Sequence, residues 1–238
     1  MTTSKKNKMD PIPLEEDANW WWYKAKNNLV HHILRKEGLN KHNKILEIGP
    51  GLGNNLKLLN QFGIIDILEI ENEFINSLKN NYSEIIDKIY ENIEEINSEY
   101  DLIIMLDILE HIEESEKFMN KVKKIMKKNG KIVIGVPAYQ SLWSSHDEAL
   151  KHYRRYTWKT LKNDCKVFNI TKKYGFNYLT FPIRFLNIKF SQSAMSTKDH
   201  SKLINTVLYS ISLIEHFLRK IGINPKFGIS IYAVLINE

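Results

Sequence analysis

The 238-residue sequence contains one cysteine, Cys165, and few prolines and glycines, 6 and 10 respectively. One thiol cannot form an intrachain disulfide, so a disulfide-stapled fold is excluded and a reducing compartment is expected. No uncharged apolar run reaches the length of about 18 residues that a membrane-spanning helix needs. The nearest candidate, 203–218, is interrupted by polar residues and predicts an amphipathic or buried helix. Residues 1–17 lack the apolar core of a secretory signal, so we expect a cytoplasmic protein.

The overall composition is that of a globular protein, with 43% hydrophobic and 26% charged residues. This excludes a disordered chain, a collagen and a coiled-coil rod. We expect a flexible tail over 1–18 and a single domain over 19–238. Residues 1–149 carry 19 Lys and Arg against 24 Asp and Glu, a net charge of −5, whereas residues 150–238 carry 15 against 4, a net charge of +11. The basic part is predicted to meet an anionic substrate or surface, or else to be a solvated face.

Short apolar runs alternate along the chain with segments of helical character. This alternation predicts a parallel sheet covered by helices on both faces. Two segments, 138–164 and 176–227, interrupt the alternation, and we expect them to form helical lid or substrate-binding insertions at the carboxyl ends of the strands. The predicted strands are 44–48, 66–70, 88–91, 101–106, 131–136 and 229–236, and the predicted helices are about 19–36, 52–62, 73–81 and 115–128.

The motif with the clearest chemistry directly follows the first predicted strand. Gly49, Gly51 and Gly53 fall within five residues, and only glycine lets a backbone turn this tightly and approach a ligand closely. Glu47 precedes the turn, and Glu69 ends the next strand, where an acidic residue is suited to ribose hydroxyls. An anionic Glu47 is a poor neighbour for a pyrophosphate and a good one for a cationic ligand. The pattern therefore points to S-adenosylmethionine (SAM) as the cofactor.

At this point the sequence resembles the class I SAM-dependent methyltransferases. The resemblance spans about residues 20–175 and the final strand, and it implies a doubly wound, Rossmann-like α/β fold of seven strands with the last antiparallel. Asn92 departs from the acidic residue usual in the family. The matching stretches are ILEIGPGLG (45–53), IDILEIENEF (65–74), YDLIIMLDILEHIEE (100–114) and KKNGKIVIGVPA (127–138). The implied cofactor contacts are Glu47, Gly49, Gly51 and Gly53 around the methionine part, Glu69 at the ribose, Ile70, Asn92 and Ile93 around the adenine, and Leu106 and Asp107 beneath the sulfonium.

A narrower resemblance rests on two further segments. The run Trp20-Trp-Trp-Tyr23 and the motif LWSSHDEALKHYRRYT (142–157) resemble a bacterial subgroup of these enzymes, many of which occur with polysaccharide, lipid or secondary-metabolite pathways. The motif is expected to hang over the sheet edge at which open α/β folds bind ligands. The alternatives are that the arginines tie the loop to the acidic part and that the aromatic residues pack on the core. The candidate substrate-binding residues are Trp22, Tyr23, Trp143, His152, Arg154 and Arg155.

The candidate catalytic residues are His146, Asp107 and His111. An imidazole such as His146 can take a proton from a hydroxyl nucleophile, although it could instead only hold the loop through Asp147. The array Asp107-x-x-Glu110-His111 resembles one with which some methyltransferases hold a divalent ion, and its spacing places the side chains on one helical face. The Glu-His pair is also common in members without metal, so we assign no metal.

We expect methyl transfer to an oxygen or nitrogen atom of a small molecule, such as an anionic compound, a sugar, a polysaccharide precursor or a secondary metabolite. A nucleic-acid substrate, suggested by the basic part, is disfavoured because apolar runs interrupt that part and no RNA-binding domain is appended. A peripheral membrane enzyme acting on a lipid or quinone-like acceptor, with 181–227 at the interface, stays open. A SAM-binding module without catalysis also stays open, as does the oligomeric state.

Overall fold

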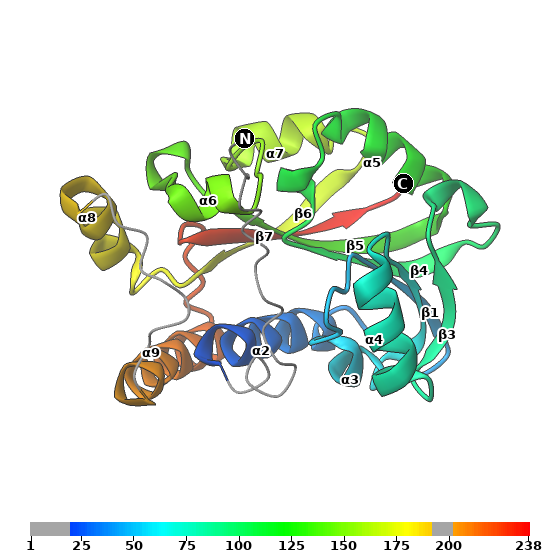
Figure 1. The fold of residues 1–238 in the computed structure, drawn as a ribbon, viewed down its shortest axis with the longest axis horizontal. Helices are drawn as coiled ribbons and strands as arrows, with labels where there is room; N and C mark the ends of the chain where they lie inside the picture. The colour runs from blue at the N-terminus through cyan, green and yellow to red at the C-terminus, as the bar shows by residue number, and fades with distance from the viewer. Residues whose placement is uncertain (1–19, 192–201) are drawn as a thin grey trace, which may run out of the picture.

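The computed structural model describes residues 20–191 and 202–238, and it centres on a seven-stranded sheet (Figure 1). The strand order is β3-β2-β1-β4-β5-β7-β6, with β7 antiparallel to both of its neighbours and the other pairs parallel. The predicted Rossmann-like fold with an antiparallel last strand is therefore confirmed. The strands are β1 (Asn43–Ile48), β2 (Gly63–Leu68), β3 (Ile86–Tyr90), β4 (Tyr100–Leu106), β5 (Met126–Pro137), β6 (Asn169–Phe176) and β7 (Ser230–Ile236).

The strand that the sequence did not locate is β6. It lies at the edge of the sheet, pairs only with β7 in the described structure, and carries the consecutive lysines Lys172 and Lys173. An edge strand faces solvent along one side, so it lacks the continuous apolar run of a strand buried between two neighbours. The second predicted insertion, 176–227, nevertheless begins where β6 ends, at Phe176.

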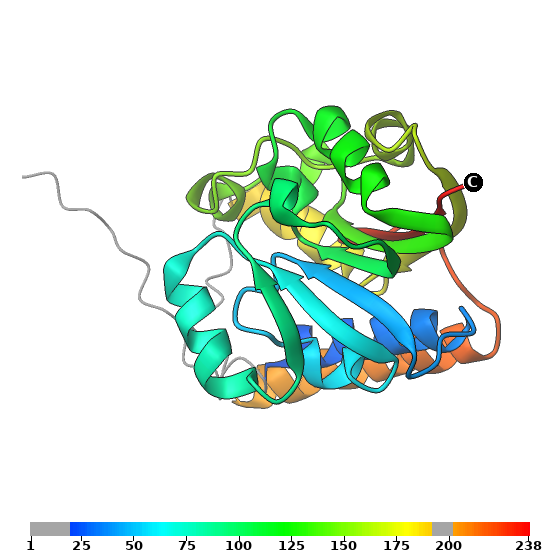
Figure 2. The ribbon, with the colours of Figure 1, turned by 90° about the vertical axis from the view of Figure 1, so that its right-hand side faces the viewer.

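Helices cover both faces of the sheet, because successive strand residues point to opposite sides. In β1, Ile45 belongs to the buried cluster under one set of helices and Leu46 to the cluster on the other face. Figures 1 and 2 show the two layers. The first face carries α2 (Trp21–Arg35), α3 (Leu56–Leu59), α4 (Asn72–Tyr82) and α9 (Lys202–Lys220), and the second carries α5 (Ser115–Lys124) and α7 (Trp158–Asp164).

The two expected insertions occupy different places. Between β5 and β6 lie the single turn η3 (Gln140–Leu142), the short helix α6 (Ser145–Ala149) and α7. Between β6 and β7 lie α8 (Phe181–Ser191), which contacts η3, and α9, which packs beside α2 along the face of the sheet and not at its edge (Figure 2). In the described part of the chain, no helix combines the length and the apolar character needed to cross a membrane.

Buried polar contacts fix α9 against the rest of the domain. The amide of Trp21 donates to Asn205 Oδ1 at 2.8 Å, which joins the first turns of α2 and α9. Glu215 is buried and accepts hydrogen bonds from the amides of Asn177 and Leu179, at 3.0 and 2.8 Å. The loop that leaves β6 is therefore held by a side chain of α9, which makes the extension part of the folded domain.

Candidate active site

The turn after β1 has an open side. Gly49 has φ +66°, and a Cβ there would lie 2.1 Å from Cδ1 of Ile108, so both backbone and space demand glycine. Gly51 has φ +54°, and no described atom lies within 4 Å of the position that a Cβ would take. The backbone at Gly51 is therefore accessible to a ligand at this edge of the sheet.

Glu69 connects this turn to the end of β2. Its Oε2 accepts a hydrogen bond from the amide of Gly51 at 3.0 Å, and its Oε1 accepts from the amides of Ile70 and Glu71 at 2.8 and 3.1 Å. An ionised carboxylate offers about four acceptor positions, so roughly one stays available for a hydroxyl donor. The geometry is compatible with the ribose contact that the sequence predicts for Glu69.

Glu47 is a second carboxyl group at this edge, and it is only 2% exposed. Asn55 Nδ2 donates to its Oε1 at 2.6 Å, while Oε2 has no hydrogen-bond partner among the described residues. Burial raises the pKa of Glu47 to about 7, although Asn55 and the charge of Lys26 act in the opposite direction. A buried carboxyl with an unused oxygen would be stabilised in its ionised form by a cationic group placed beside it.

Lys26 is a further candidate site residue, which the sequence did not single out. It is buried on α2, and its Nζ lies 2.9 Å from Oδ2 of Asp107, which directly follows β4 in a left-handed conformation with φ +58°. Burial lowers the pKa of Lys26, but Asp107 and Tyr23 outweigh that effect, so the pKa is raised above its usual value. Its signal was a charged residue within the apolar stripe of α2, between Trp22 and Leu29.

The residues expected near the adenine and the sulfonium follow β2, β3 and β4 at the same edge. Ile70 is 70% exposed and offers an apolar surface, whereas Ile93 and Leu106 are buried. Asn92 accepts a hydrogen bond from the amide of Glu94 at 3.2 Å and so caps the single turn η1 (Ile93–Glu95). Its side-chain amide group keeps donor capacity, but this contact gives Asn92 a local structural role as well.

Asp147 organises the motif loop, the segment 142–157 that carries the sequence LWSSHDEALKHYRRYT. Its carboxylate accepts from Arg155 Nε at 2.7 Å and Nη2 at 3.0 Å, and it lies 3.0 Å from Nδ1 of His152. The amide of Ser144 adds a hydrogen bond at 2.9 Å. Although burial alone would raise the pKa of Asp147, these partners hold it well below its usual range. A negative charge is therefore fixed beneath His152.

Both arginines of the motif have partners within the protein. Arg155 is buried against Asp147 and also donates to the carbonyl of Ala138 at 3.3 Å. Arg154 donates to the carbonyl of Glu113 at 2.6 Å and to Ser115 Oγ at 3.1 Å. Arg154 thus ties the loop to the acidic first part of the chain, as the alternative interpretation of the arginines expects, whereas Arg155 acts within the loop and on the end of β5.

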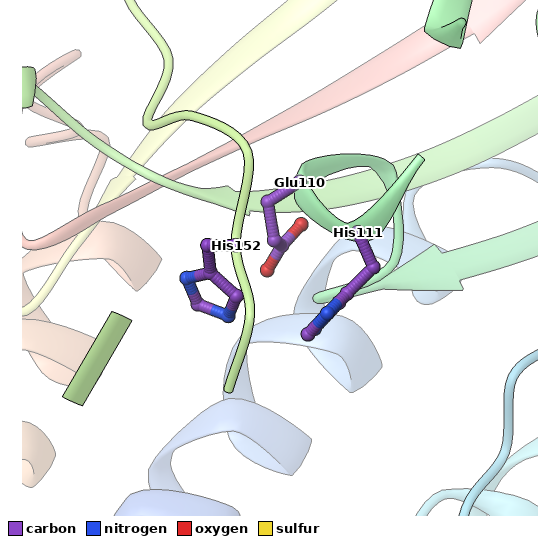
Figure 3. A group of neighbouring side chains, drawn as sticks. All are labelled: Glu110, His111 and His152. Carbon is purple, nitrogen blue, oxygen red and sulfur yellow. The ribbon is translucent and has the colours of Figure 1, made fainter. Parts of the chain in front are cut away.

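Three titratable side chains meet next to this loop (Figure 3). Glu110 and His111 lie on the single turn η2 (Leu109–His111), and His152 lies on the motif loop, with its ring centroid 4.5 Å from that of His111. Burial lowers the pKa of His146, and the charges of His152 and Arg155 add to that effect, whereas Asp147 opposes it. An imidazole with a lowered pKa is neutral at pH 7 and able to accept a proton.

The expected aromatic residues divide between two places. Trp22 is half-buried, with its ring centroid 5.0 Å from that of Phe176 at the end of β6. Tyr23 lies with its ring 5.2 Å below Nζ of Lys26, next to the Lys26–Asp107 pair. Trp143 is half-buried and follows η3 in the first insertion. The start of α2 therefore places Tyr23 next to the end of β4 and packs Trp22 on the end of β6.

Comparison with known proteins gives the same picture of the fold. The neighbours include the N-methyltransferase NodS from Bradyrhizobium japonicum WM9 in complex with S-adenosyl-L-homocysteine (11% identity, TM-score 0.55, covering 96% of this chain and 90% of NodS). They also include magnesium protoporphyrin IX methyltransferase from Synechocystis PCC 6803 with bound S-adenosylhomocysteine (10% identity, TM-score 0.58, covering 98% of this chain and 90% of that enzyme). Phosphoethanolamine N-methyltransferase 2 from Haemonchus contortus, in complex with SAM, matches over 92% of this chain and 56% of its own, with 13% identity and a TM-score of 0.55. SAM and its demethylated product are thus the ligands of these neighbours.

A search of curated proteins found no significant match to the sequence. A family model described as a methyltransferase domain matches residues 21–179, from the start of α2 to just beyond β6. That range contains the glycine turn, Glu69, Asp107 and the motif loop. The chain belongs to the methyltransferase-domain family.

Proposed function

We propose that the protein transfers a methyl group from SAM to an oxygen or nitrogen atom of a small-molecule acceptor. The observation that carries this proposal is the pair of carboxyl groups at the ends of β1 and β2. Glu69 is tied to the open glycine turn, and Glu47 has an unused buried oxygen. Glu69 suits hydroxyl donors and Glu47 suits a cationic amino group. SAM carries both kinds of group, on its ribose and on its methionine part.

The residues of the chain would act mainly by positioning. When bound, the cofactor supplies a methyl group on a positively charged sulfur. Glu47, Glu69 and the Gly51 backbone would fix its orientation, and the buried Lys26–Asp107 pair would close the region where β4 ends. Fixing two reactants in line can supply several kcal/mol of the barrier. For a hydroxyl acceptor, neutral His146 would take the proton, with Asp107 and His111 as the other candidate catalytic residues.

The acceptor is expected to lie between the start of α2 and the motif loop. Trp22, Tyr23 and Trp143 would contribute apolar walls, and His152 a polar contact. The family's solved neighbours act on chemically different compounds, as the phosphoethanolamine and magnesium protoporphyrin enzymes show. We propose an anionic compound, a sugar or polysaccharide precursor, or a secondary metabolite as the acceptor class. The internal partners of Arg154 and Arg155 leave them a positioning role unless a substrate displaces those contacts.

Calorimetric titration with SAM and with S-adenosylhomocysteine tests the cofactor site. Gly51→Arg fills the open side of the turn and Glu69→Ala removes the hydroxyl acceptor, so each is expected to abolish most of the binding. Matched controls are Gly222→Arg, at an exposed glycine with φ +95° outside the site, and Glu71→Ala, at an exposed carboxylate beside Glu69. Unchanged affinity in both site variants would refute the assignment.

We also propose that α9 brings the enzyme to an anionic membrane surface, where a lipid or quinone-like acceptor would be found. One stripe of the helix is apolar and exposed, with Leu203, Val207, Ile214 and Phe217 at helical spacing, and exposed Ile221 directly follows the helix. Lys202, Lys220 and Lys226 are exposed on the same segment, and Glu215, its single carboxylate among the described residues 177–186 and 202–228, is buried. An exposed apolar stripe that is flanked by lysines and not by exposed carboxylates is complementary to an anionic lipid surface.

Sedimentation with vesicles separates this proposal from self-association. We expect binding to vesicles of mixed phosphatidylcholine and phosphatidylserine, and strongly reduced binding to phosphatidylcholine alone. Ile214→Glu/Phe217→Glu should abolish it, whereas Ile64→Glu, at an exposed position on β2, should not. A dimer in solution that the same double variant dissociates, without vesicle binding, would contradict the membrane proposal.

A further inference from the structure

Glu110, His111 and His152 form a cluster that the sequence alone did not bring together. One ligand-capable atom from each lies within 4.8 Å of those of the other two (Figure 3). The contact is built into the backbone, because the amide of Tyr153 donates to the carbonyl of Glu110 at 2.8 Å. His152 is thereby held against η2, 41 residues away in the sequence from His111.

The carboxylate of Glu110 is unusual among the buried acids of this protein. The residue is 1% exposed, and neither carboxylate oxygen has a hydrogen-bond partner on another described residue. Glu69 and Asp147, by contrast, each accept three or more hydrogen bonds. A buried carboxylate without partners is costly, and buried charges are normally paired or coordinate a metal. Glu110 therefore has two oxygens available for a ligand beside the histidines.

His152 is oriented by a second carboxylate behind its ring. Nδ1 of His152 faces the carboxylate of Asp147 at 3.0 Å, which leaves Nε2 for another partner. The ring of His111 packs edge-on against that of His152, with the two centroids 4.5 Å apart. Metal-binding histidines almost always donate their second ring N–H to a carboxylate or a backbone carbonyl, which fixes the tautomer and the ring orientation. The carboxylate of Asp147 is in turn fixed by Arg155.

We propose that Glu110, His111 and His152 bind a divalent first-row transition-metal ion beside the methyl-transfer site. The mixed set of one carboxylate and two imidazoles favours Mn²⁺, Co²⁺ or Zn²⁺ over Mg²⁺ or Ca²⁺, which prefer oxygen ligands. Ligands at about 2.1 Å from one ion are at most about 4.2 Å apart, so small side-chain rotations complete the site. His111 is exposed and free to make such a rotation.

This proposal rests on the proposed methyltransferase function and narrows its acceptor class. Three protein ligands leave coordination positions open to a hydroxyl of the acceptor, and a bound metal lowers the pKa of a coordinated oxygen. The site therefore favours an acceptor that presents a hydroxyl group, and O-methylation over N-methylation. The metal site lies next to the end of β4, because Glu110 follows Leu106, the last residue of that strand, by four positions.

Metal binding is measured on the full chain with any histidine tag removed, after dialysis against a chelator. Calorimetric titration with Mn²⁺, Zn²⁺ and Mg²⁺ alone is expected to show one tightly bound Mn²⁺ or Zn²⁺ and much weaker Mg²⁺. His152→Ala and Glu110→Gln should weaken binding by about 100-fold or more. His42→Ala, at an exposed histidine outside the cluster, is the matched control.

His111→Ala keeps the test decisive, because an exposed side chain can be removed without unfolding the protein, which circular dichroism verifies. Loss of metal binding in His111→Ala but not in His42→Ala supports the proposal. Equal metal affinity in the wild type and in all three cluster variants, or no binding in the wild type, overturns it. SAM titration of the same metal-free samples is a separate readout, so failure of the metal site and failure of the cofactor site are distinguishable.

Discussion

Replacing Glu47 by Gln tests how the buried carboxyl at the end of β1 is used. Gln is neutral and can keep the hydrogen bond from Asn55, so it resembles the protonated form of Glu47. The pKa of Glu47 rises from an ordinary value of 4.5 to about 7, mainly through burial. At 1.36 kcal/mol per pH unit, this shift corresponds to about 3 kcal/mol of unfolding free energy. The side chain is nearly inaccessible to solvent, so little screening reduces that figure.

The direction follows from proton linkage. Below pH 4.5, Glu47 is protonated in both the folded and the unfolded protein, so it does not lower the free energy of unfolding there. Between 4.5 and about 7 the unfolded chain loses the proton while the folded chain retains it, so the free energy of unfolding decreases as the pH rises. Above about 7 the full cost of a buried charge is present. Glu47→Gln removes this cost and is expected to be the more stable protein at pH 8.

Urea unfolding of both proteins between pH 4.5 and 8.5 measures the effect. The unfolding free energy of Glu47→Gln relative to the wild type should increase by about 3 kcal/mol across this range. Glu71→Gln, which removes an exposed carboxylate from the same edge, serves as the control for net charge. A difference between Glu47→Gln and the wild type that does not change with pH would refute the reasoning.

The same substitution distinguishes a cofactor ligand from a structural acid. On the proposed placement, the amino group of SAM pairs with ionised Glu47, so SAM affinity should fall by about tenfold between pH 8 and pH 6. In Glu47→Gln, affinity should be weaker at pH 8 and should lose this pH dependence. A wild-type affinity that stays constant across this range would remove Glu47 from the cofactor site while leaving the stability prediction intact.

Three further predictions concern the motif loop. His146→Ala should reduce turnover by about 10²–10⁴-fold in a steady-state assay while leaving SAM affinity unchanged, and full activity would limit His146 to a role in the loop. Asp147→Asn leaves Arg155 buried beside a neutral group, so chemical denaturation should show a loss of about 3–5 kcal/mol; a loss under 1 kcal/mol would contradict that pairing. Because Asp147 also orients His152, this variant should bind Mn²⁺ about 10–100-fold more weakly. An unchanged Mn²⁺ affinity would contradict the orienting role of Asp147.

The strands could be predicted where burial leaves a continuous apolar signal. The segment 101–106 lies in the middle of the sheet, is flanked by β1 and β5, and was assigned within one residue of β4. The edge strand β6 was missed, because Lys172 and Lys173 dilute its pattern. The helix expected over 52–62 proved to be Leu56–Leu59, with hydrogen-bonded turns before it. Local propensity does not show where a turn becomes a helix.

In the candidate site, contacts between neighbouring strand ends could be predicted from the sequence, whereas contacts between distant segments could not. The proximity of the glycine turn and Glu69 could be predicted, because each sits at a strand end that the sequence marks and parallel strands bring such ends together. The Lys26–Asp107 pair joins residues 81 positions apart, and the Tyr153–Glu110 hydrogen bond joins residues 43 apart. Pairings of this kind depend on how helices and insertions pack over the sheet, which no periodicity encodes.

The charge difference between the two parts of the chain takes on a more specific meaning. Much of the basic excess after residue 150 serves the fold, since Arg154, Arg155, Arg219 and Lys172 have acceptors or carboxylate partners within the protein. These cations neutralise acids or cap carbonyl groups and have little field left for an external anion. The exposed lysines Lys202, Lys220 and Lys226 along the α9 extension have no such partner and lie beside an apolar stripe, as no other basic group after residue 150 does among the described residues. On our proposals, the basic part therefore meets an anionic surface through 202–226 and its apolar stripe, and the motif loop contributes to the choice of acceptor.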